Sequence, residues 1–145
     1  MHIQLISSDD AIYKHMQYLR WRVLLEPIGV PASYMDPERE KNDLLIAAME
    51  GEEVIGCCIL SCIDNDTIQL RQMAVETKKQ TSGVGRAIVF FAESIAKEKG
   101  YVLLMMHARD AVIPFYQKCG YHISGNGFEE VGIPHHRMEK QLEHR

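Results

Sequence analysis

A turn that contains two glycines constrains the fold of this chain more than any other stretch: Gln80-Thr81-Ser82-Gly83-Val84-Gly85-Arg86-Ala87. A strand-like run, 68–75, precedes the turn, and an amphipathic helical run, 84–99, follows it. Glycine allows positive φ and lets the backbone approach a ligand without an intervening Cβ. The free N–H groups and the dipole at a helix start favour an anion, and the two hydroxyls and the arginine can add to it. The turn predicts a phosphate cradle, while a plain tight turn remains the alternative.

Two familiar phosphate-binding loops do not fit this turn. A Walker loop needs Lys followed by Ser or Thr after its last glycine, where this chain has Arg86 and Ala87. A dinucleotide-binding fingerprint needs Gly or Ala where Ile88 stands, and an acidic residue about 20 residues further on. The segment 105–107 has no carboxylate, and the next one is Asp110.

The spacing Gln-x-x-Gly-x-Gly instead resembles the signature of the GNAT superfamily of acyl-CoA-dependent N-acyltransferases, which lies between a strand and a helix. A second block, 111–121, resembles the downstream Phe-Tyr-x-x-x-Gly-Phe/Tyr element of that family. The segment 132–135, with Met138 after it, is similar to the closing strand of a small bacterial subgroup typified by ElaA. The resemblance extends from about Leu44 to the end of the chain, and more loosely before it.

This resemblance implies an N-acetyltransferase that moves an acetyl group directly from acetyl-CoA to a primary amine of a small molecule or peptide. It implies that the pyrophosphate of coenzyme A lies in the glycine turn and that its pantetheine arm pairs with the preceding strand. The implied CoA-binding residues are Met73, Ala74, Val75, Gln80, Thr81, Ser82, Gly83, Val84, Gly85, Arg86, Ala87 and Tyr116. A non-catalytic acyl-CoA-binding sensor or partner module stays open as the alternative.

Acyl transfer from a thioester needs a neutral amine, a stabilised oxyanion and a proton for the leaving thiolate. The family element implies that the Tyr116 hydroxyl lies near the CoA sulfur, where a phenol with a pKa of about 10 stays protonated at neutral pH. A core tyrosine is the competing interpretation. For the base we favour His135, because imidazole titrates near pH 6.5. Two alternatives for the base remain open. The proton can leave through water, or one of four further side chains can accept it: Glu26, Glu76, His107 or Glu129.

Periodicity and turn residues predict the other elements. We expect a first helix that starts within 7–10 and stops at Pro27 and Gly29, and a long loop, 27–42, with a short helix. The expected strands are 44–49, 54–62, 67–75, 101–107 and 133–142, with helices over 84–99 and 110–119, the latter regular only from Pro114.

The elements together predict one α/β domain, 1–145. Its mixed central sheet has about six or seven strands and about four flanking helices. The family resemblance adds that two parallel strands splay apart to hold the acyl-CoA. It also implies that loop 27–42 and segment 128–136 form the acceptor pocket.

Composition limits the partners. The formal net charge of −4 argues against a general nucleic-acid binder, which would carry a basic surplus. No apolar run approaches the roughly 20 residues that span a bilayer, and the first residues lack signal-peptide features, so we expect a cytoplasmic protein without a membrane partner. The four cysteines have no metal spacing and are expected to be buried free thiols. A homodimer is left open.

Overall fold

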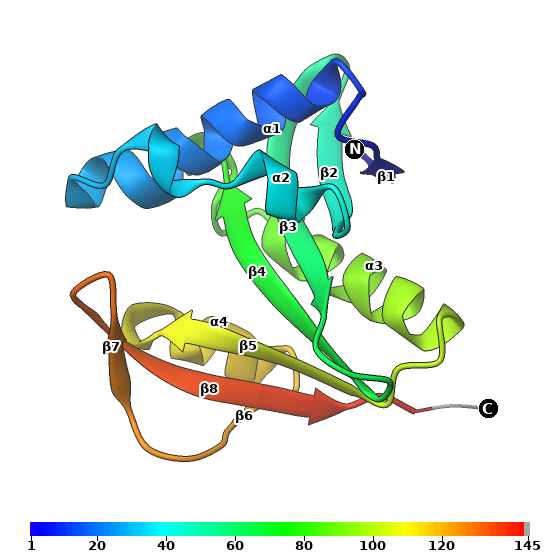
Figure 1. The fold of residues 1–145 in the computed structure, drawn as a ribbon, viewed down its shortest axis with the longest axis vertical. Coiled ribbons are helices and arrows are strands. Elements are labelled where there is room, and N and C mark those ends of the chain that lie inside the picture. Colours follow the sequence, from blue (N-terminus) through cyan, green and yellow to red (C-terminus); the bar gives the residue numbers. More distant parts are fainter. Residues whose placement is uncertain (144–145) are drawn as a thin grey trace.

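The computed structural model describes residues 1–143. Figure 1 shows a central sheet with helices around it. The strands are β1 (His2–Ile6), β2 (Leu44–Glu50), β3 (Glu53–Cys62), β4 (Thr67–Val75), β5 (Leu103–Arg109), β6 (His122–Ile123), β7 (Phe128–Glu130) and β8 (Ile133–Gln141). The α-helices are α1 (Ile12–Arg20), α2 (Pro37–Glu40), α3 (Val84–Glu98) and α4 (Ile113–Lys118). A π-helical turn, Trp21–Leu25, extends α1, and short 3-10 turns lie at Glu26–Ile28, Ala32–Tyr34, Thr77–Lys79 and Asp110–Val112.

The strand order is β1-β2-β3-β4-β5-β8-β6, and β7 pairs with β8 beside this path. All neighbouring strands are antiparallel except β4 and β5, which are parallel and joined through α3. A parallel pair needs such a crossover connection, and the apolar stripe on 84–98 supplies a helix that covers the sheet.

Alternate residues of the sheet pack against helices on its two faces. Leu45 and Ala47 of β2 belong to a core cluster with Met16 of α1, whereas Ile46 belongs to a second cluster with Ile88 of α3. This alternation follows from the two-residue period of a strand. The sheet is therefore buried between α1 on one face and α3 with α4 on the other.

The parallel strands β4 and β5 separate soon after they start. Their residues pair only from Thr67–Leu103 to Gln69–Met105, and beyond that point the two strands diverge, as Figure 1 shows. A bulge in the β3–β4 register lies in the same stretch, where Gln72 has a φ of 55°. The splay that the family resemblance implied is therefore present.

Over the described residues 1–143 the sheet has eight strands rather than the predicted six or seven, while the four α-helices found there agree with the prediction. The sequence analysis missed β1, a five-residue edge strand with only partial burial, which leaves little apolar signal. It also missed β6 and β7, which have two and three residues. Strands this short are stabilised by their partner β8 rather than by their own sequence pattern.

The starts of two helices and the burial of one cysteine also differ from the prediction. Helix α1 begins at Ile12, because Asp10 closes a preceding turn by accepting a hydrogen bond from the Ile12 N–H at 2.9 Å. Asp110 lies in a 3-10 turn before α4, which becomes regular near Pro114 as expected. Cys62 is exposed, whereas Cys57, Cys58 and Cys119 are buried, and all four are free thiols.

Within residues 1–143, no helix is both long and apolar enough to cross a membrane. The same residues contain no group of three or more His, Cys, Asp or Glu side chains that could hold a metal ion.

Candidate active site

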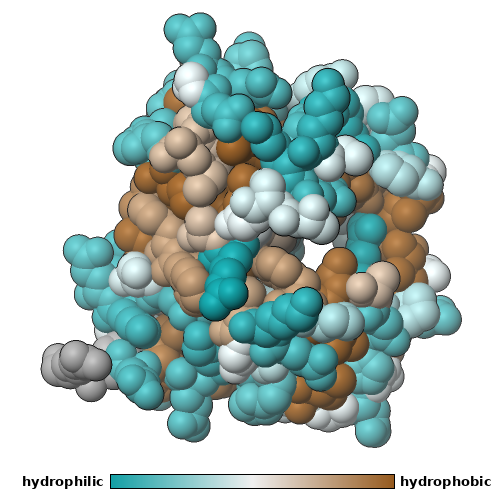
Figure 2. Space-filling view, turned by 180° about the vertical axis from the view of Figure 1, so that it is seen from behind, coloured by the Kyte–Doolittle hydropathy of each residue, from teal (hydrophilic) through white to brown (hydrophobic). Residues whose placement is uncertain are grey.

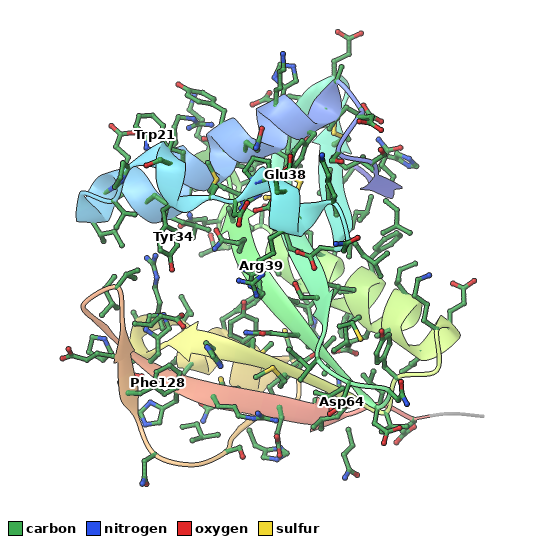
Figure 3. The ribbon with its side chains drawn as sticks, viewed as in Figure 1. Trp21, Tyr34, Glu38, Arg39, Asp64 and Phe128 are labelled. Carbon is green, nitrogen blue, oxygen red and sulfur yellow. The ribbon has the colours of Figure 1, made fainter. Side chains whose placement is uncertain are left out.

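A cleft of about 790 Å³ lies where β4 and β5 diverge. Seen from behind, the space-filling surface is hollowed at this place, and the hollow opens through the molecule (Figure 2). Side chains from both halves of the fold line it. In Figure 3, Tyr34 points toward this space from the side of α1 and α2. Glu130 of β7 lines the cleft as well. A ligand could therefore enter from either face.

The glycine turn forms one end of the cleft. Thr81 and Gly83 have φ values of 69° and 91°, so the backbone is left-handed just before α3 begins. A Cβ built on Gly83 would have no atom within 4 Å, which leaves open space in front of the turn. The 15-residue α3 has no side-chain cap, so the N–H groups of its first turn are free for a ligand. This geometry fits the predicted anion cradle.

The predicted cradle residues contribute unequally. Gln80, Thr81, Gly83, Gly85 and Arg86 line the cleft. Gln80 also ties the turn to β4, because its Nε2 donates to the Val75 carbonyl at 3.1 Å.

The other three predicted cradle residues are used differently. The Ser82 hydroxyl donates to the Lys79 carbonyl within the turn. The Ala87 N–H donates to the Gly83 carbonyl at 3.1 Å, so it serves the helix rather than a ligand. The Val84 side chain is buried in the core, which leaves its backbone as the part that could face an anion.

Gly85 lies at a close packing contact. A Cβ at this position would lie 3.1 Å from Cζ of Phe115 on α4 and 3.7 Å from Cγ2 of Val75 on β4. The second glycine of the motif therefore lets α3, α4 and the end of β4 meet at the cleft.

The edge of β4 that faces the cleft has no strand partner among the described residues beyond Gln69. An unpaired edge offers backbone N–H and C=O groups to an extended ligand, as in strand addition. Met73 and Val75 line the cleft, whereas the Ala74 side chain is buried in the cluster beneath α1. Ala74 can therefore contribute only backbone groups.

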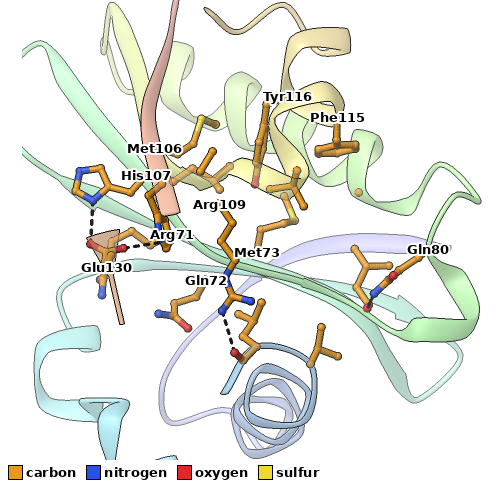
Figure 4. A pocket seen from close by; sticks show the side chains of 18 of the residues that line it. Arg71, Gln72, Met73, Gln80, Met106, His107, Arg109, Phe115, Tyr116 and Glu130 are labelled. Atoms are coloured by element: carbon orange, nitrogen blue, oxygen red, sulfur yellow. Dashed lines mark hydrogen bonds and ion pairs between the residues drawn. The ribbon is translucent and has the colours of Figure 1, made fainter. Parts of the chain in front are cut away.

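Tyr116 projects from α4 into the cleft, and Figure 4 shows its hydroxyl pointing inward. The residue is only 5% exposed, and its ring contacts Phe115 at 5.0 Å and Tyr121 at 6.1 Å between centroids. Burial, with smaller contributions from the Cys58 and Cys119 thiols, raises the pKa of Tyr116 well above its usual 10. The hydroxyl therefore stays protonated at neutral pH.

His135 on β8 lies in the same cleft, close to Glu130 and His107. Its Nδ1 is 2.7 Å from the Ile133 carbonyl, which can only accept, so the neutral ring carries its proton on Nδ1 and has a free lone pair on Nε2. Nε2 is 3.7 Å from Oε2 of Glu130, and Oε1 of Glu130 is 3.1 Å from Nδ1 of His107. Figure 4 shows Glu130 and His107 of this group at one side of the cleft.

The other base candidates are placed less suitably. Two hydrogen bonds of 3.3 and 2.7 Å from Arg22 hold Glu76 and lower the pKa of its carboxyl. Glu26 and Glu129 are exposed and do not line the cleft.

The sequence analysis did not single out five charged or amide residues of the cleft: Arg71, Gln72, Arg109, Lys118 and Glu130. Alternation could have separated Glu130 from Glu129, since Phe128 and Glu130 share one face of β7. Arg71, Gln72 and Arg109 belong to no sequence motif. They line one cleft because β4 and β5 splay apart.

A family model described as an acetyltransferase (GNAT) domain matches residues 22–142 of this chain. A Bacillus subtilis (strain 168) protein, YjcF, named as an uncharacterised N-acetyltransferase, is 29% identical over 136 residues, or 93% of this chain and 96% of YjcF. An uncharacterised protein of the same organism, YyaT, is 38% identical over 76 residues. That match spans 52% of this chain and about half (51%) of YyaT.

Solved structures share the fold at low sequence identity. The chain superposes on Escherichia coli ElaA with a TM-score of 0.82 at 16% identity, over 97% of this chain and 99% of ElaA. An aminoglycoside 6'-N-acetyltransferase complexed with coenzyme A gives a TM-score of 0.84 at 16% identity, over 100% of this chain and 99% of that one. These likenesses confirm the predicted fold class.

Proposed function

Since the chain belongs to the acetyltransferase (GNAT) domain family, we propose that it transfers an acetyl group from acetyl-CoA to an amine of a small molecule or peptide. The family assignment confirms the enzyme class expected from the sequence, and the identity of the acceptor is part of the proposal. We extend the proposal to one acyltransferase domain over 1–145, acting in the cytoplasm.

The observation that carries this proposal is the alignment of two features along one cleft. The uncapped start of α3 with Gly83 and Arg86 would hold the pyrophosphate of acetyl-CoA, and the unpaired edge of β4 near Met73 and Val75 would hold its pantetheine arm. An anion site and an extended backbone edge in line are what a long ligand with a diphosphate requires.

Acetyl-CoA supplies the acetyl thioester when it is bound. Backbone N–H groups of the free β4 edge would polarise the thioester carbonyl, because they have no strand partner beyond Gln69 among the described residues. Tyr116 donates its phenolic proton to the leaving sulfur. Because burial raises its pKa, the phenol stays protonated at neutral pH and is available as a proton donor beside the sulfur.

The amine must lose a proton as the amide forms. His135 accepts that proton on Nε2, whose lone pair faces the cleft side where Glu130 lies at 3.7 Å. The nearby carboxylate stabilises the resulting imidazolium. We infer that Glu130 positions and supports His135 rather than touching the amine itself.

The experiment that tests the proposal combines binding with turnover. Acetyl-CoA at about 100 times its dissociation constant stabilises the fold by roughly 2.7 kcal/mol, and NADH and ATP at equal concentration do far less. With a panel of primary amines, free CoA thiol appears in proportion to enzyme. Stabilisation by NADH but not by acetyl-CoA contradicts the proposal, and binding of acetyl-CoA without any thiol release favours the sensor alternative.

A further inference from the structure

Arg109, at the end of β5, reaches into the cleft without a carboxylate partner among the described residues. Its Nη2 donates to the backbone carbonyl of Leu24, 2.9 Å away. In Figure 4 its side chain crosses the cleft between Tyr116 on α4 and Gln72 on β4. Arg109 thus lies in the same cleft as Tyr116, beside which the proposed function places the thioester.

Other arginines of the described chain that are at least partly buried do have a carboxylate. Arg20 pairs with Glu40 at 2.7 Å, Arg22 with Glu76 at 2.7 Å, and Arg71 with Asp43 at 3.7 Å. A guanidinium has five N–H donors and is always charged, so a single neutral carbonyl leaves most of its donors unused. A bound anion would complete the hydrogen bonding of Arg109.

The charges around the cleft favour such an anion. Arg71, Arg86, Arg109 and Lys118 line the cleft together with one carboxylate, Glu130. Arg86 and Lys118 come from the start of α3 and the end of α4, on the side of the phosphate cradle. Arg71 and Arg109 remain for the acceptor side, and Glu130 is already engaged with His107 at 3.1 Å.

This distribution of charge suits a different acceptor from that of one structural neighbour. An aminoglycoside carries several ammonium groups, and like charges across a binding site cost free energy. The aminoglycoside 6'-N-acetyltransferase that shares this fold therefore does not provide a model for the acceptor of this chain.

We propose that the acceptor is a small amine that also carries a carboxylate, of the amino acid type, and that Arg109 binds this carboxylate while the amine faces the thioester. The inference rests on the proposed function. The cleft of about 790 Å³ must also hold the pantetheine arm, so the acceptor is small. Guanidinium and carboxylate match in a planar, bidentate geometry, which gives the interaction direction as well as strength.

The test compares α-amino acids with their α-carboxamides, which keep the amine and the side chain and lose only the carboxylate charge. For the wild type we expect kcat/KM to be about ten- to hundredfold higher for the acid than for the amide of the best pair, as one charged hydrogen-bonded contact provides. Arg109→Gln should reduce this ratio to about one, mainly through KM. Arg109→Lys should keep part of it.

Arg137→Gln is the matched control, because Arg137 pairs with Glu139 on β8 and does not line the cleft. This variant should keep the acid-to-amide ratio of the wild type. Equal losses for acids and amides in Arg109→Gln, with a lower melting temperature, would show that Arg109 only braces Leu24, and equal losses in kcat alone would place it at the thioester. Either result overturns the inference.

Measurements on the wild type distinguish the failure of the carboxylate site from the failure of the acetyltransferase proposal. Turnover of amines with no preference for acids over amides refutes the carboxylate site and leaves the acetyltransferase proposal standing. If no amine is acetylated, the proposed function fails, and calorimetry with the same acids and amides decides the inference. Binding of acids that Arg109→Gln abolishes supports it, and equal or absent binding of both classes refutes it.

Discussion

Replacing Tyr116 by phenylalanine tests the general acid, because it removes one oxygen and keeps the ring. The ring packs against Phe115 and Tyr121, and these contacts do not involve the hydroxyl. Among the described residues, no hydrogen bond joins the Tyr116 hydroxyl to another group, so its loss should change the free energy of unfolding by less than about 1 kcal/mol. The acetyl-CoA dissociation constant should change little, since the cradle lies at the start of α3.

Turnover, by contrast, should fall strongly. A positioned proton donor contributes about 10²–10⁴ in rate, which corresponds to about 3–5 kcal/mol in the barrier. Because burial raises the pKa of Tyr116, the wild-type enzyme should lose no activity through deprotonation of this phenol up to about pH 10. We would measure kcat by thiol release, acetyl-CoA affinity by calorimetry, and stability by thermal melting.

Tyr121→Phe is the matched control. Tyr121 is 3% exposed and donates to Glu93 at 2.8 Å, outside the cleft. Its variant should lose about 1–3 kcal/mol of stability and keep kcat per folded molecule. If Tyr116→Phe folds normally and retains full kcat, Tyr116 is not the acid, and if it shows the pattern of Tyr121→Phe, it is a core residue.

Two further variants test the cradle and the support of the loop that precedes β2. Gly83→Val should abolish acetyl-CoA binding in calorimetry, because the methyls enter the space before α3, and its φ of 91° adds about 1–3 kcal/mol of strain; normal binding would reduce the motif to a plain turn. Glu40→Gln should cost about 3–5 kcal/mol in denaturant unfolding, because Arg20 is 1% exposed and would lose its buried partner; a cost below 1 kcal/mol would contradict this. Burial alone would raise the pKa of Glu40, but hydrogen bonds from Arg20 and Tyr13 outweigh it and hold the pKa below its usual 4.5. Unfolding then takes up protons at acidic pH, so wild-type stability should be complete above about pH 4.5 and fall below it, with a shallower decline in Glu40→Gln; equal slopes would refute the assignment.

The sequence could predict the parts of the fold that local patterns determine. The strand over 67–75 and the helix from Val84 agree with the structure in their bounds to within a residue or two, because alternation, an apolar stripe and the glycine turn all act within a short window. The edge strand β1 was missed because an exposed edge needs little apolar surface. Its register with β2 is set by a partner strand about 40 residues away in the chain, with pairs from Ile6–Leu45 to His2–Met49.

The candidate site likewise has a part that local sequence patterns determine and a part that long-range contacts determine. That the glycine turn, the helix start and Arg86 come together could be predicted, since they are contiguous in the chain, and the structure places Gly83, Gly85 and Arg86 at the cleft; their role as a cradle stays a prediction. Arg109 could not, because its position depends on the divergence of β4 from β5 and on a carbonyl 85 residues earlier, at Leu24. Glu130 was confused with Glu129, because the three-residue strand that decides which of them faces the cleft was not recognised.

The most direct test of the central claim follows the acetyl group itself. The enzyme is incubated with acetyl-CoA that carries a deuterated acetyl group and with small primary amines, and both products are measured. We predict an amide that carries the deuterated acetyl group, formed in amounts equal to the free CoA thiol and dependent on Gly83 and Tyr116. Thiol release without a labelled amide would mean hydrolysis, and tight acetyl-CoA binding with neither product would mean a binding module. Either outcome would contradict the account.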